Sequence, residues 1–184
     1  MSDPKSRGLL QVYTGNGKGK TTASLGMAIR AAAQGMKVAI IYFDKGGTHY
    51  SERRILEQRF GGEIDFWATG LDRIDPINGR FRFGVTADDR EEAQRGLEIV
   101  QALFDAGSHD LMILDEINTT VSLGMLDEAD ALDTLALKPD DMEVVLTGRD
   151  APESFMEHAD LVSEVRLVKH YFYQGVPARE GIDF

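Results

Sequence analysis

The chain has 184 residues, of which 42% are hydrophobic and 28% are charged, a composition typical of a globular protein with a buried core. Its formal net charge of -11 argues against nucleic acids and anionic membranes as partners, because both need a basic protein surface. The absence of cysteine excludes disulfides, thiolate nucleophiles and cysteine-based metal sites.

We expect one domain over residues 1–184, because no repeat, low-complexity tract or Pro/Gly/Ser-rich linker divides the chain. The first residues lead into a strand-like stretch and not into the apolar core of a signal peptide. The longest apolar run, Val38–Phe43, is far too short to span a bilayer. A soluble, cytoplasmic protein is therefore expected.

Short runs typical of strands alternate along the chain with longer stretches typical of helices. Several of the strand-like runs are apolar at successive positions, as expected for strands covered on both faces. The alternation predicts an α/β fold, with a parallel sheet of about six strands and helices on both faces. The predicted strands are Leu9–Tyr13, Val38–Phe43, Ile64–Ala68, Leu111–Asp115, Val144–Thr147 and Leu161–Val168.

The ends of the predicted helices carry recognisable residues. One helix runs from about Lys20 to Gly35, and a longer one begins at Thr86 and ends at Gly107. Asp89, three residues after Thr86, gives the longer helix a capping-box pattern. The other predicted helix starts are Asp127 and Asp150–Glu153, the latter with a proline near the first turn.

A glycine-rich loop follows the first strand and leads directly into the first helix. Such a loop binds phosphate when glycines let backbone N–H groups turn inward, a lysine reaches the phosphates and a hydroxyl binds Mg²⁺. Lys20 and Thr21 provide the last two groups, and Lys18 adds a cation. We expect Lys20 to be exposed at the loop–helix junction. The loop reads Thr14, Gly15, Asn16, Gly17, Lys18, Gly19, Lys20, Thr21 and Thr22.

The loop departs from the general phosphate-loop pattern at Thr14, where that pattern has glycine. A glycine- and lysine-rich surface turn is the alternative interpretation. The order of strand, loop and helix favours phosphate binding over this alternative, because the motif requires that context.

Two carboxylates, Asp115 and Glu116, end an apolar strand. Mg²⁺ held between a nucleotide and a protein takes few protein oxygens, typically a hydroxyl and a carboxylate. We therefore predict that Asp115 and Glu116 form the second half of the metal site, with Thr21 and Glu116 as the residues that bind the ion. The alternative is that Glu116 caps the following helix. Asn118 could orient a carboxylate, although asparagine is also common in turns.

Two cations follow other predicted strands, Lys45 after the second and Arg149 after the fifth. Ligands of parallel sheets bind at the carboxyl ends of the strands, so both are candidate phosphate contacts. Solvated loops remain the alternative for each. The four histidines show no metal-ligand spacing.

Taken together, these motifs resemble the ATP:corrinoid adenosyltransferases that have a P-loop fold, over the range Gly8–Phe184. The glycine-rich loop is similar to that family's own variant, which accounts for Thr14. The C-terminal motifs are the most specific, because other P-loop enzymes have no reason to share them. The further similar motifs are 43–46, 68–70, 114–116, 147–149, 159–165, 168–170 and 175–184.

The resemblance implies a P-loop NTPase-like (RecA-like) fold, a homodimer and a reaction. The family transfers the 5′-deoxyadenosyl group of ATP to cob(I)alamin or a precursor such as cobinamide, releasing triphosphate, with a flavoprotein reductase as a possible partner. It is thought to bind ATP with the phosphates reversed relative to other P-loop enzymes. On this basis Lys20 and Glu116 are the predicted catalytic residues, acting on the leaving triphosphate together with Lys18 and Thr21.

The chain departs from the family pattern at the corrinoid face. Some members carry an aromatic pair where Leu71 and Arg73 stand here, and it packs under the corrin. We expect Arg73 to be poorly suited to this place, because burying its charge without a partner is costly. Some members also have a long N-terminal helix over the corrinoid, whereas seven residues precede Gly8 here. The candidates for corrinoid contacts are Leu71, Ile74, Phe81 and Phe83.

Two other function classes stay open at this point. One is a P-loop kinase or NTPase acting at the γ-phosphate, which would form ADP instead of triphosphate. The other is a non-catalytic module that binds a nucleotide or a corrinoid without turnover.

Overall fold

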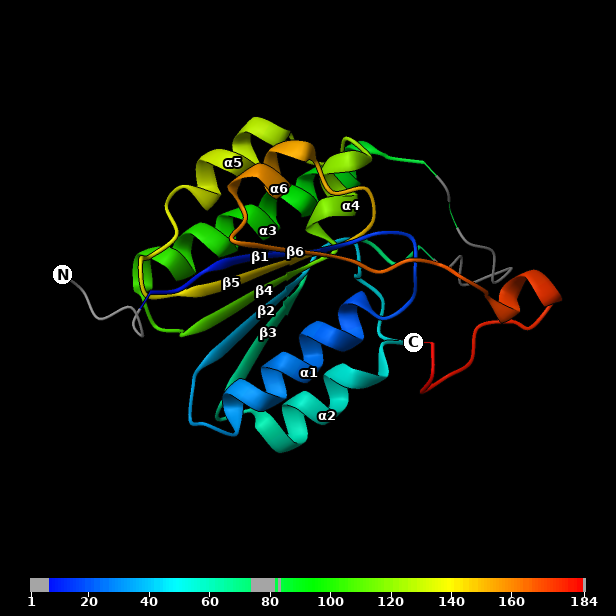
Figure 1. Cartoon of the computed structure of the whole chain (residues 1–184), viewed down its shortest axis with the longest axis horizontal. Helices are drawn as coiled ribbons and strands as arrows, with labels where there is room; N and C mark the ends of the chain where they lie inside the picture. The colour runs from blue at the N-terminus through cyan, green and yellow to red at the C-terminus, as the bar shows by residue number, and fades with distance from the viewer. Residues whose placement is uncertain (1–6, 74–81, 83, 184) are drawn as a thin grey trace.

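The computed structural model describes residues 7–73, 82 and 84–183, and these form a six-stranded sheet with helices on both faces (Figure 1). The strand order is β3-β2-β4-β5-β1-β6, and all neighbouring strands in this sheet are parallel. The predicted α/β class and strand number are confirmed. The strands are β1 Leu10–Thr14, β2 Val38–Tyr42, β3 Ile64–Ala68, β4 Leu111–Asp115, β5 Glu143–Thr147 and β6 Leu161–Glu164.

The helices form two layers (Figure 1). Helices α1 and α2 cover one face of the sheet, and α3, α4, α5 and α6 cover the other. None of the described helices is long and apolar enough to cross a membrane. The helices are α1 Lys20–Ala32, α2 Ser51–Phe60, α3 Ala87–Ala106, α4 Ile117–Ser122, α5 Glu128–Leu135 and α6 Glu153–His158, with a 3-10 turn η1 at Tyr171–Gln174.

The predicted helix ends agree with the structure. Thr86 and Asp89 form the reciprocal capping box of α3, and Gly107 ends that helix in the left-handed conformation at φ 56°. Gly35 likewise has φ 80° just beyond α1, and Asp127 caps α5. Pro152 stands one position earlier than predicted, at the N-cap of α6.

The sequence did not indicate α2. Its sequence is strongly polar, and Leu56 is its one buried residue. An amphipathic pattern needs a repeated apolar stripe, and α2 lacks one because it lies near the sheet edge formed by β3.

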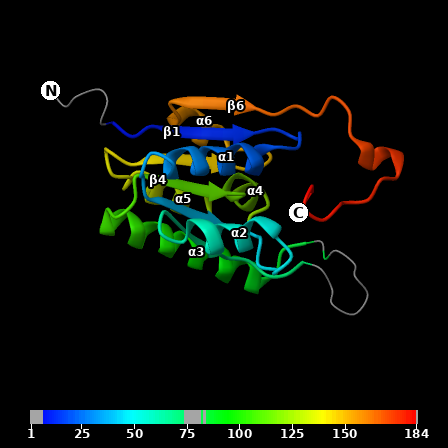
Figure 2. The ribbon, with the colours of Figure 1, turned by 90° about the horizontal axis from the view of Figure 1, so that it is seen from below.

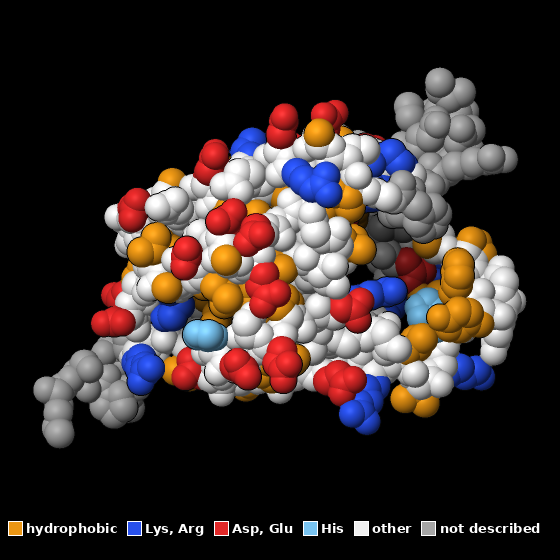
Figure 3. All heavy atoms as spheres, turned by 90° about the horizontal axis from the view of Figure 1, so that it is seen from above, with side chains coloured by type: hydrophobic (Ala, Val, Ile, Leu, Met, Phe, Trp, Pro, Cys, Tyr) orange, Lys and Arg blue, Asp and Glu red, His pale blue; other side chains and the backbone are white. Residues whose placement is uncertain are grey.

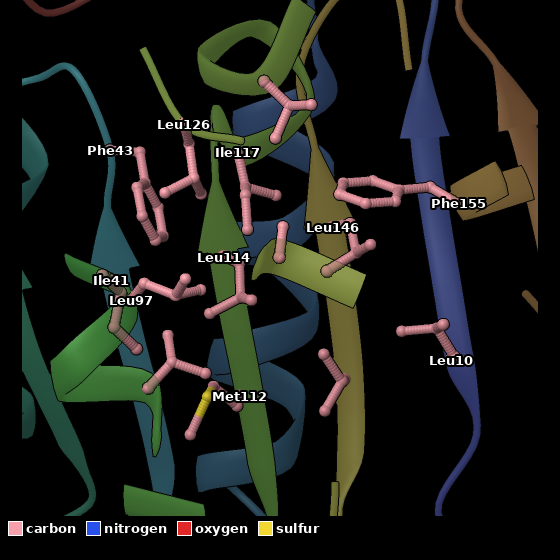
Figure 4. Close-up of a cluster of buried hydrophobic side chains, with 14 of the residues drawn as sticks. Leu10, Ile41, Phe43, Leu97, Met112, Leu114, Ile117, Leu126, Leu146 and Phe155 are labelled. Carbon is pink, nitrogen blue, oxygen red and sulfur yellow. The ribbon is translucent and has the colours of Figure 1, made fainter. Parts of the chain in front are cut away.

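The core has two parts, one on each face of the sheet. On the α3 side, Leu97 of α3 and Phe155 of α6 pack against Leu114 and Leu146 of the strands (Figure 4). On the α1 side, Ala28 packs with the opposite side chains of the same strands. Both faces of β2 and β4 are therefore covered, which explains their continuous apolar sequence.

The last strand is shorter than predicted. It ends at Glu164 and not at Val168, because the next backbone groups bond to the glycine-rich loop. Gly17 N donates to Val165 O at 2.7 Å, and Leu167 N donates to Asn16 Oδ1 at 3.0 Å. From there the chain runs out beyond the carboxyl edge of the sheet and turns back (Figures 1 and 2).

Candidate nucleotide site

The glycine-rich loop connects β1 to α1 at the carboxyl edge of the sheet. Gly15 and Gly19 have φ values of 97° and 120°, which side chains rarely adopt. A Cβ on Gly15 or Gly17 would lie 2.5 or 2.7 Å from Val165 O. Glycine is therefore needed in the loop both for its backbone conformation and for the close approach of the segment that follows β6.

Lys20 lies inside this loop. Its Nζ donates to Gly15 O at 2.8 Å and to Gly17 O at 2.9 Å. The side chain is buried, with 6% of the residue exposed, so the expectation of an exposed lysine was wrong. The pKa of Lys20 is lowered, mainly because burial disfavours its charged form. Lys20 is the first residue of α1, and its side chain thus bonds to two carbonyl groups of the loop that precedes the helix.

Lys18 points to the C-terminal segment, residues 170–183. Its Nζ bonds to Asp183 and donates to Ile182 O at 2.7 Å and Tyr171 Oη at 3.1 Å. The Asp183 carboxylate also accepts from Arg179 N at 2.9 Å. The lysine expected to contact phosphate therefore ties the loop to the end of the chain.

The acidic pair, Asp115 and Glu116, lies beside the loop at the end of β4. Asp115 is fully buried, and Thr147 Oγ1 donates to its Oδ1 at 2.7 Å. Glu116 has φ 65° and occupies the N-cap position of α4 without a side-chain cap bond. Thr119 Oγ1 donates to Glu116 Oε2 at 2.6 Å. Thr119 thus orients the Glu116 carboxylate, and this carboxylate does not cap the helix.

Lys45 connects the acidic pair to the phosphate loop. Its Nζ donates to Asp115 Oδ2 at 2.5 Å and to Thr21 Oγ1 at 3.1 Å, and lies 3.8 Å from Glu116 Oε1. Burial alone would lower the pKa of Lys45, but the charges of Asp115 and Glu116 outweigh it and raise the pKa. Lys45 is therefore an ammonium group held among oxygen atoms.

The loop after β2 is fixed by a residue that sequence reasoning missed. Arg53 of α2 donates to Lys45 O and, at 2.9 Å, to Gly47 O, and its guanidinium lies over the rings of Tyr42 and Tyr50. Because α2 was not predicted, nothing in the sequence pointed to this arginine.

The loops after β4 and β5 are held together by polar residues. Asn118 is buried, and its Nδ2 donates to Tyr13 O at 3.4 Å and Gly148 O at 3.5 Å. It therefore joins strand ends and does not orient a carboxylate. Arg149 N donates to Thr119 Oγ1 at 2.9 Å, which places Arg149 at the same edge.

A pocket of about 690 Å³ opens between the phosphate loop and the C-terminal segment. Figure 3 shows a hollow between the body of the molecule and the projecting chain. One wall is polar and carries the predicted site residues Asn16, Gly17, Lys18, Gly19, Lys20, Thr21, Thr22, Lys45, Glu116 and Arg149. The other wall includes Tyr171, Phe172, Val176 and Ile182. The sequence singled out this C-terminal segment by resemblance, but no residue pattern predicted that it lines the site.

A second cavity of about 170 Å³ adjoins the pocket and is lined by both Leu71 and Arg73. Arg73 is 8% exposed, and its Nε donates to Asp44 Oδ1 at 2.7 Å while its Nη1 donates to Gly84 O at 3.0 Å. Arg73 is therefore buried with a carboxylate partner, which the sequence did not indicate. The candidate contacts Ile74, Phe81 and Phe83 lie outside the described residues.

The oxygen donors at the loop suit a hard cation. Thr21 Oγ1, Asp115 Oδ2 and Glu116 Oε1 all lie within 3.8 Å of one cationic nitrogen, so they already converge on one position. Over residues 7–73, 82 and 84–183, no cluster of three or more His, Asp or Glu side chains could hold a metal ion. A few protein oxygens completed by phosphate and water are what Mg²⁺ adopts with nucleotides.

Comparison with known proteins identifies relatives over nearly the whole chain. Residues 6–184 match the family model described as "ATP:corrinoid adenosyltransferase BtuR/CobO/CobP". A protein named corrinoid adenosyltransferase from Escherichia coli (strain K12) is 39% identical, over 97% of this chain and 86% of its own. One of the same name from Sinorhizobium sp is 37% identical, over 97% of this chain and 81% of its own.

A solved structure shares the fold. The flagellar accessory protein FlaH from Methanocaldococcus jannaschii superimposes with a TM-score of 0.57 at 12% identity, covering 86% of this chain and 71% of FlaH. This likeness concerns the fold alone and agrees with the predicted P-loop NTPase-like (RecA-like) architecture.

Proposed function

Because the chain belongs to the ATP:corrinoid adenosyltransferases, we propose that its phosphate loop and acidic pair bind MgATP and stabilise the triphosphate released during adenosyl transfer. The enzyme transfers the 5′-deoxyadenosyl group of ATP to the cobalt of a reduced corrinoid. The observation that carries the site assignment is the 690 Å³ pocket, which Lys20, Thr21 and Glu116 all line.

The reaction determines which contributions to catalysis the protein must make. A cobalt–carbon bond forms at C5′ of ATP while the bond from C5′ to the phosphate oxygen breaks, and its electron pair leaves with triphosphate. The reduced cobalt is itself the nucleophile, so no protein base is needed. Alignment of two bound reactants can contribute up to about 7–11 kcal/mol to lowering the barrier. Charge stabilisation of the leaving group is the second contribution.

We assign the charge stabilisation to the polar wall of the pocket. Lys20 is held by two loop carbonyls, so its ammonium is fixed at the phosphate loop, next to the N-terminus of α1. Lys45 and Arg149 are cations at the same edge. Lys18, Asn16 and Thr22 complete the contacts that we propose for the phosphates. The Lys20 ammonium is held in the loop before ATP binds, which limits reorganisation during the reaction.

We propose Thr21 and Glu116 as the Mg²⁺ ligands. The metal would neutralise charge developing on the triphosphate. Glu116 has a left-handed backbone, and its carboxylate is held for this task by the hydroxyl of Thr119 in the first turn of α4. Asp115, one residue earlier, is fully buried and bonded to Thr147, so we assign it a supporting role.

On the corrinoid side we propose Leu71 as an apolar contact, together with Ile74, Phe81 and Phe83. Leu71 lines the smaller cavity, which shares Lys45, Tyr50 and Glu116 with the nucleotide pocket. A corrinoid at this place would lie next to ATP. Since Arg73 is engaged with Asp44, it is not free to pack beneath a corrin ring.

Four further proposals do not depend on the geometry of the site. We propose that residues 1–184 form one domain, that the enzyme is a homodimer, that a flavoprotein reductase supplies the reduced corrinoid, and that the reaction takes place in the cytoplasm. Light scattering tests the homodimer. A mass of one chain at micromolar concentration would contradict it.

An assay with chemically reduced cob(I)alamin and ATP tests the activity. We expect a light-sensitive adenosylcorrinoid to form, seen by its absorbance, at a rate that depends on Mg²⁺. Binding of both substrates without turnover under strong reduction would instead indicate a non-catalytic module. Turnover of ATP without any corrinoid would indicate a kinase or NTPase.

A further inference from the structure

Three oxygen atoms surround the ammonium group of Lys45. Asp115 Oδ2 lies 2.5 Å from Nζ, Thr21 Oγ1 3.1 Å and Glu116 Oε1 3.8 Å. The side chain is 14% exposed, so water provides little of its solvation. Lys45 therefore neutralises the buried Asp115 and the half-buried Glu116 when no nucleotide is bound.

Two of these oxygens, on Thr21 and Glu116, are those that we propose as ligands of Mg²⁺. Mg²⁺ holds its oxygen ligands at about 2.0–2.1 Å, in a tight octahedron. A metal ion bound to Thr21 and Glu116 would come close to an ammonium group that contacts the same atoms. Because the two cations repel each other strongly at such a distance, they cannot share the position.

The backbone of Lys45 is fixed, so a movement that makes room must come from its side chain. Lys45 N donates to Thr69 O at 3.0 Å, and Arg53 bonds to Lys45 O from the other side. A Cβ on Gly46 would lie 1.9 Å from Gly70 O, so the two loops are packed backbone against backbone. The Lys45 side chain, in contrast, borders both the nucleotide pocket and the adjoining cavity.

We infer that Lys45 is a displaceable counter-ion, which occupies the metal position in the nucleotide-free enzyme and leaves it when Mg²⁺ arrives with ATP. This inference rests on the proposed MgATP site. It assigns an order to binding: the free enzyme does not take up the metal alone, and the metal enters together with the triphosphate. The displaced ammonium then faces the same pocket as the phosphates.

Binding of Mn²⁺ to the nucleotide-free protein tests this inference, because the electron paramagnetic resonance signal of free Mn²⁺ falls when the ion binds. Lys45→Met keeps most of the side-chain volume and removes the charge. We expect the variant to bind one Mn²⁺ at least about tenfold more tightly than the natural protein does. Lys45→Gln serves as a second neutral variant where Lys45→Met is unstable.

Two further variants locate the effect. Lys45→Met combined with Glu116→Gln should lose the gained affinity, because the carboxylate that would hold Mn²⁺ is gone. Lys18→Met removes an equal charge from the same pocket, but Lys18 contacts Asp183 and not the acidic pair. We expect it to leave Mn²⁺ binding unchanged.

Equal Mn²⁺ affinities in the natural protein and the Lys45 variants would overturn the inference, and so would an equal gain in Lys18→Met. Neither measurement uses ATP. Calorimetry of MgATP with the natural protein therefore tests the proposed function separately. If MgATP does not bind, the nucleotide site is contradicted. If MgATP binds but the Lys45 variants show no increase in Mn²⁺ affinity, only the role of Lys45 is contradicted.

Discussion

Lys20 shows how a single buried cation organises the phosphate loop. Its Nζ donates to two loop carbonyls, so its replacement removes two internal bonds as well as the phosphate contact that we propose. We expect Lys20→Met to weaken ATP binding by about 10- to 100-fold, because hydrogen bonds to charged groups contribute about 1.5–3 kcal/mol each. Calorimetry measures the affinity, and a thermal melt measures the loss of stability that its burial implies.

Lys37→Met is the matched control for Lys20. Lys37 lies just before β2, at the opposite edge of the sheet, and its Nζ bonds to Gly62 O. We expect this variant to bind ATP as the natural protein does. Near-normal ATP affinity in Lys20→Met would contradict the assignment of the phosphate loop.

Glu116 is the second residue with a separable role. Glu116→Gln keeps the shape and the bond from Thr119 but loses the charge, so we expect half-saturation to need about tenfold more Mg²⁺, equivalent to ~1.4 kcal/mol. A Mg²⁺ titration of activity measures this. Glu52→Gln changes another carboxylate of the same pocket and should leave the titration unchanged. The same midpoint in all three proteins would show that Glu116 is not a ligand.

At the scale of elements, the Asp183 carboxylate helps to hold the C-terminal segment to the phosphate loop. Asp183 bonds to Lys18 and Tyr171 and accepts from Arg179 N. We expect Asp183→Asn to raise amide hydrogen exchange over residues 170–183 by about tenfold or more, since local opening then costs less. Asp105→Asn, on the exposed side of α3, is the control and should leave this exchange unchanged.

The same contact has a pH dependence. Hydrogen bonds to Asp183, first from Lys18 and then from Tyr171, hold the pKa of its carboxyl group below the ordinary range. A carboxyl group whose pKa is lower in the folded state than in the unfolded state stabilises the folded state at pH values above the unfolded pKa, about 3.9. This stabilisation is lost as the pH falls below that value toward the folded pKa. Protection of the 170–183 amides, measured against the exchange rate of an unfolded peptide at the same pH, should therefore be high at neutral pH and fall in acid below about pH 4. Rapid exchange already at pH 7 would contradict the anchoring role.

Elements whose buried apolar residues follow a regular pattern could be predicted from the sequence, whereas elements held by polar contacts could not. The strands β2 and β4 are continuous apolar runs, and the capping residues of α3 act within four positions of each other. Helix α2 buries one leucine, so it leaves no stripe. The end of β6 depends on the bond that Gly17 N donates to Val165 O, and these residues lie too far apart along the chain for any local pattern.

The residues of the site also divide into those that short sequence motifs predict and those that depend on long-range contacts. Lys20, Thr21 and Glu116 stand in short motifs at strand ends, and the parallel sheet brings strand ends to one edge. The sequence could not indicate that Lys20 is buried, that Arg73 pairs with Asp44, or that Lys45 contacts Thr21, because each depends on how separate loops approach one another.

At the scale of the whole molecule, an acidic protein carries a locally basic pocket. The net charge is -11, yet Lys18, Lys20, Lys45 and Arg149 all line the nucleotide pocket. The order β3-β2-β4-β5-β1-β6 explains this, because it places β1, β2, β4 and β5 side by side in the centre of the sheet. The loops that follow these four strands carry the cations and the acidic pair.

Phosphorus-31 nuclear magnetic resonance of the products tests the central claim most directly, because only adenosyl transfer breaks the bond at C5′ and leaves the three phosphates joined. With ATP, Mg²⁺ and chemically reduced cob(I)alamin, we predict intact triphosphate in equal amount to the adenosylcorrinoid formed, and none without the corrinoid. ADP with inorganic phosphate, formed at the same rate with or without the corrinoid, would contradict the account.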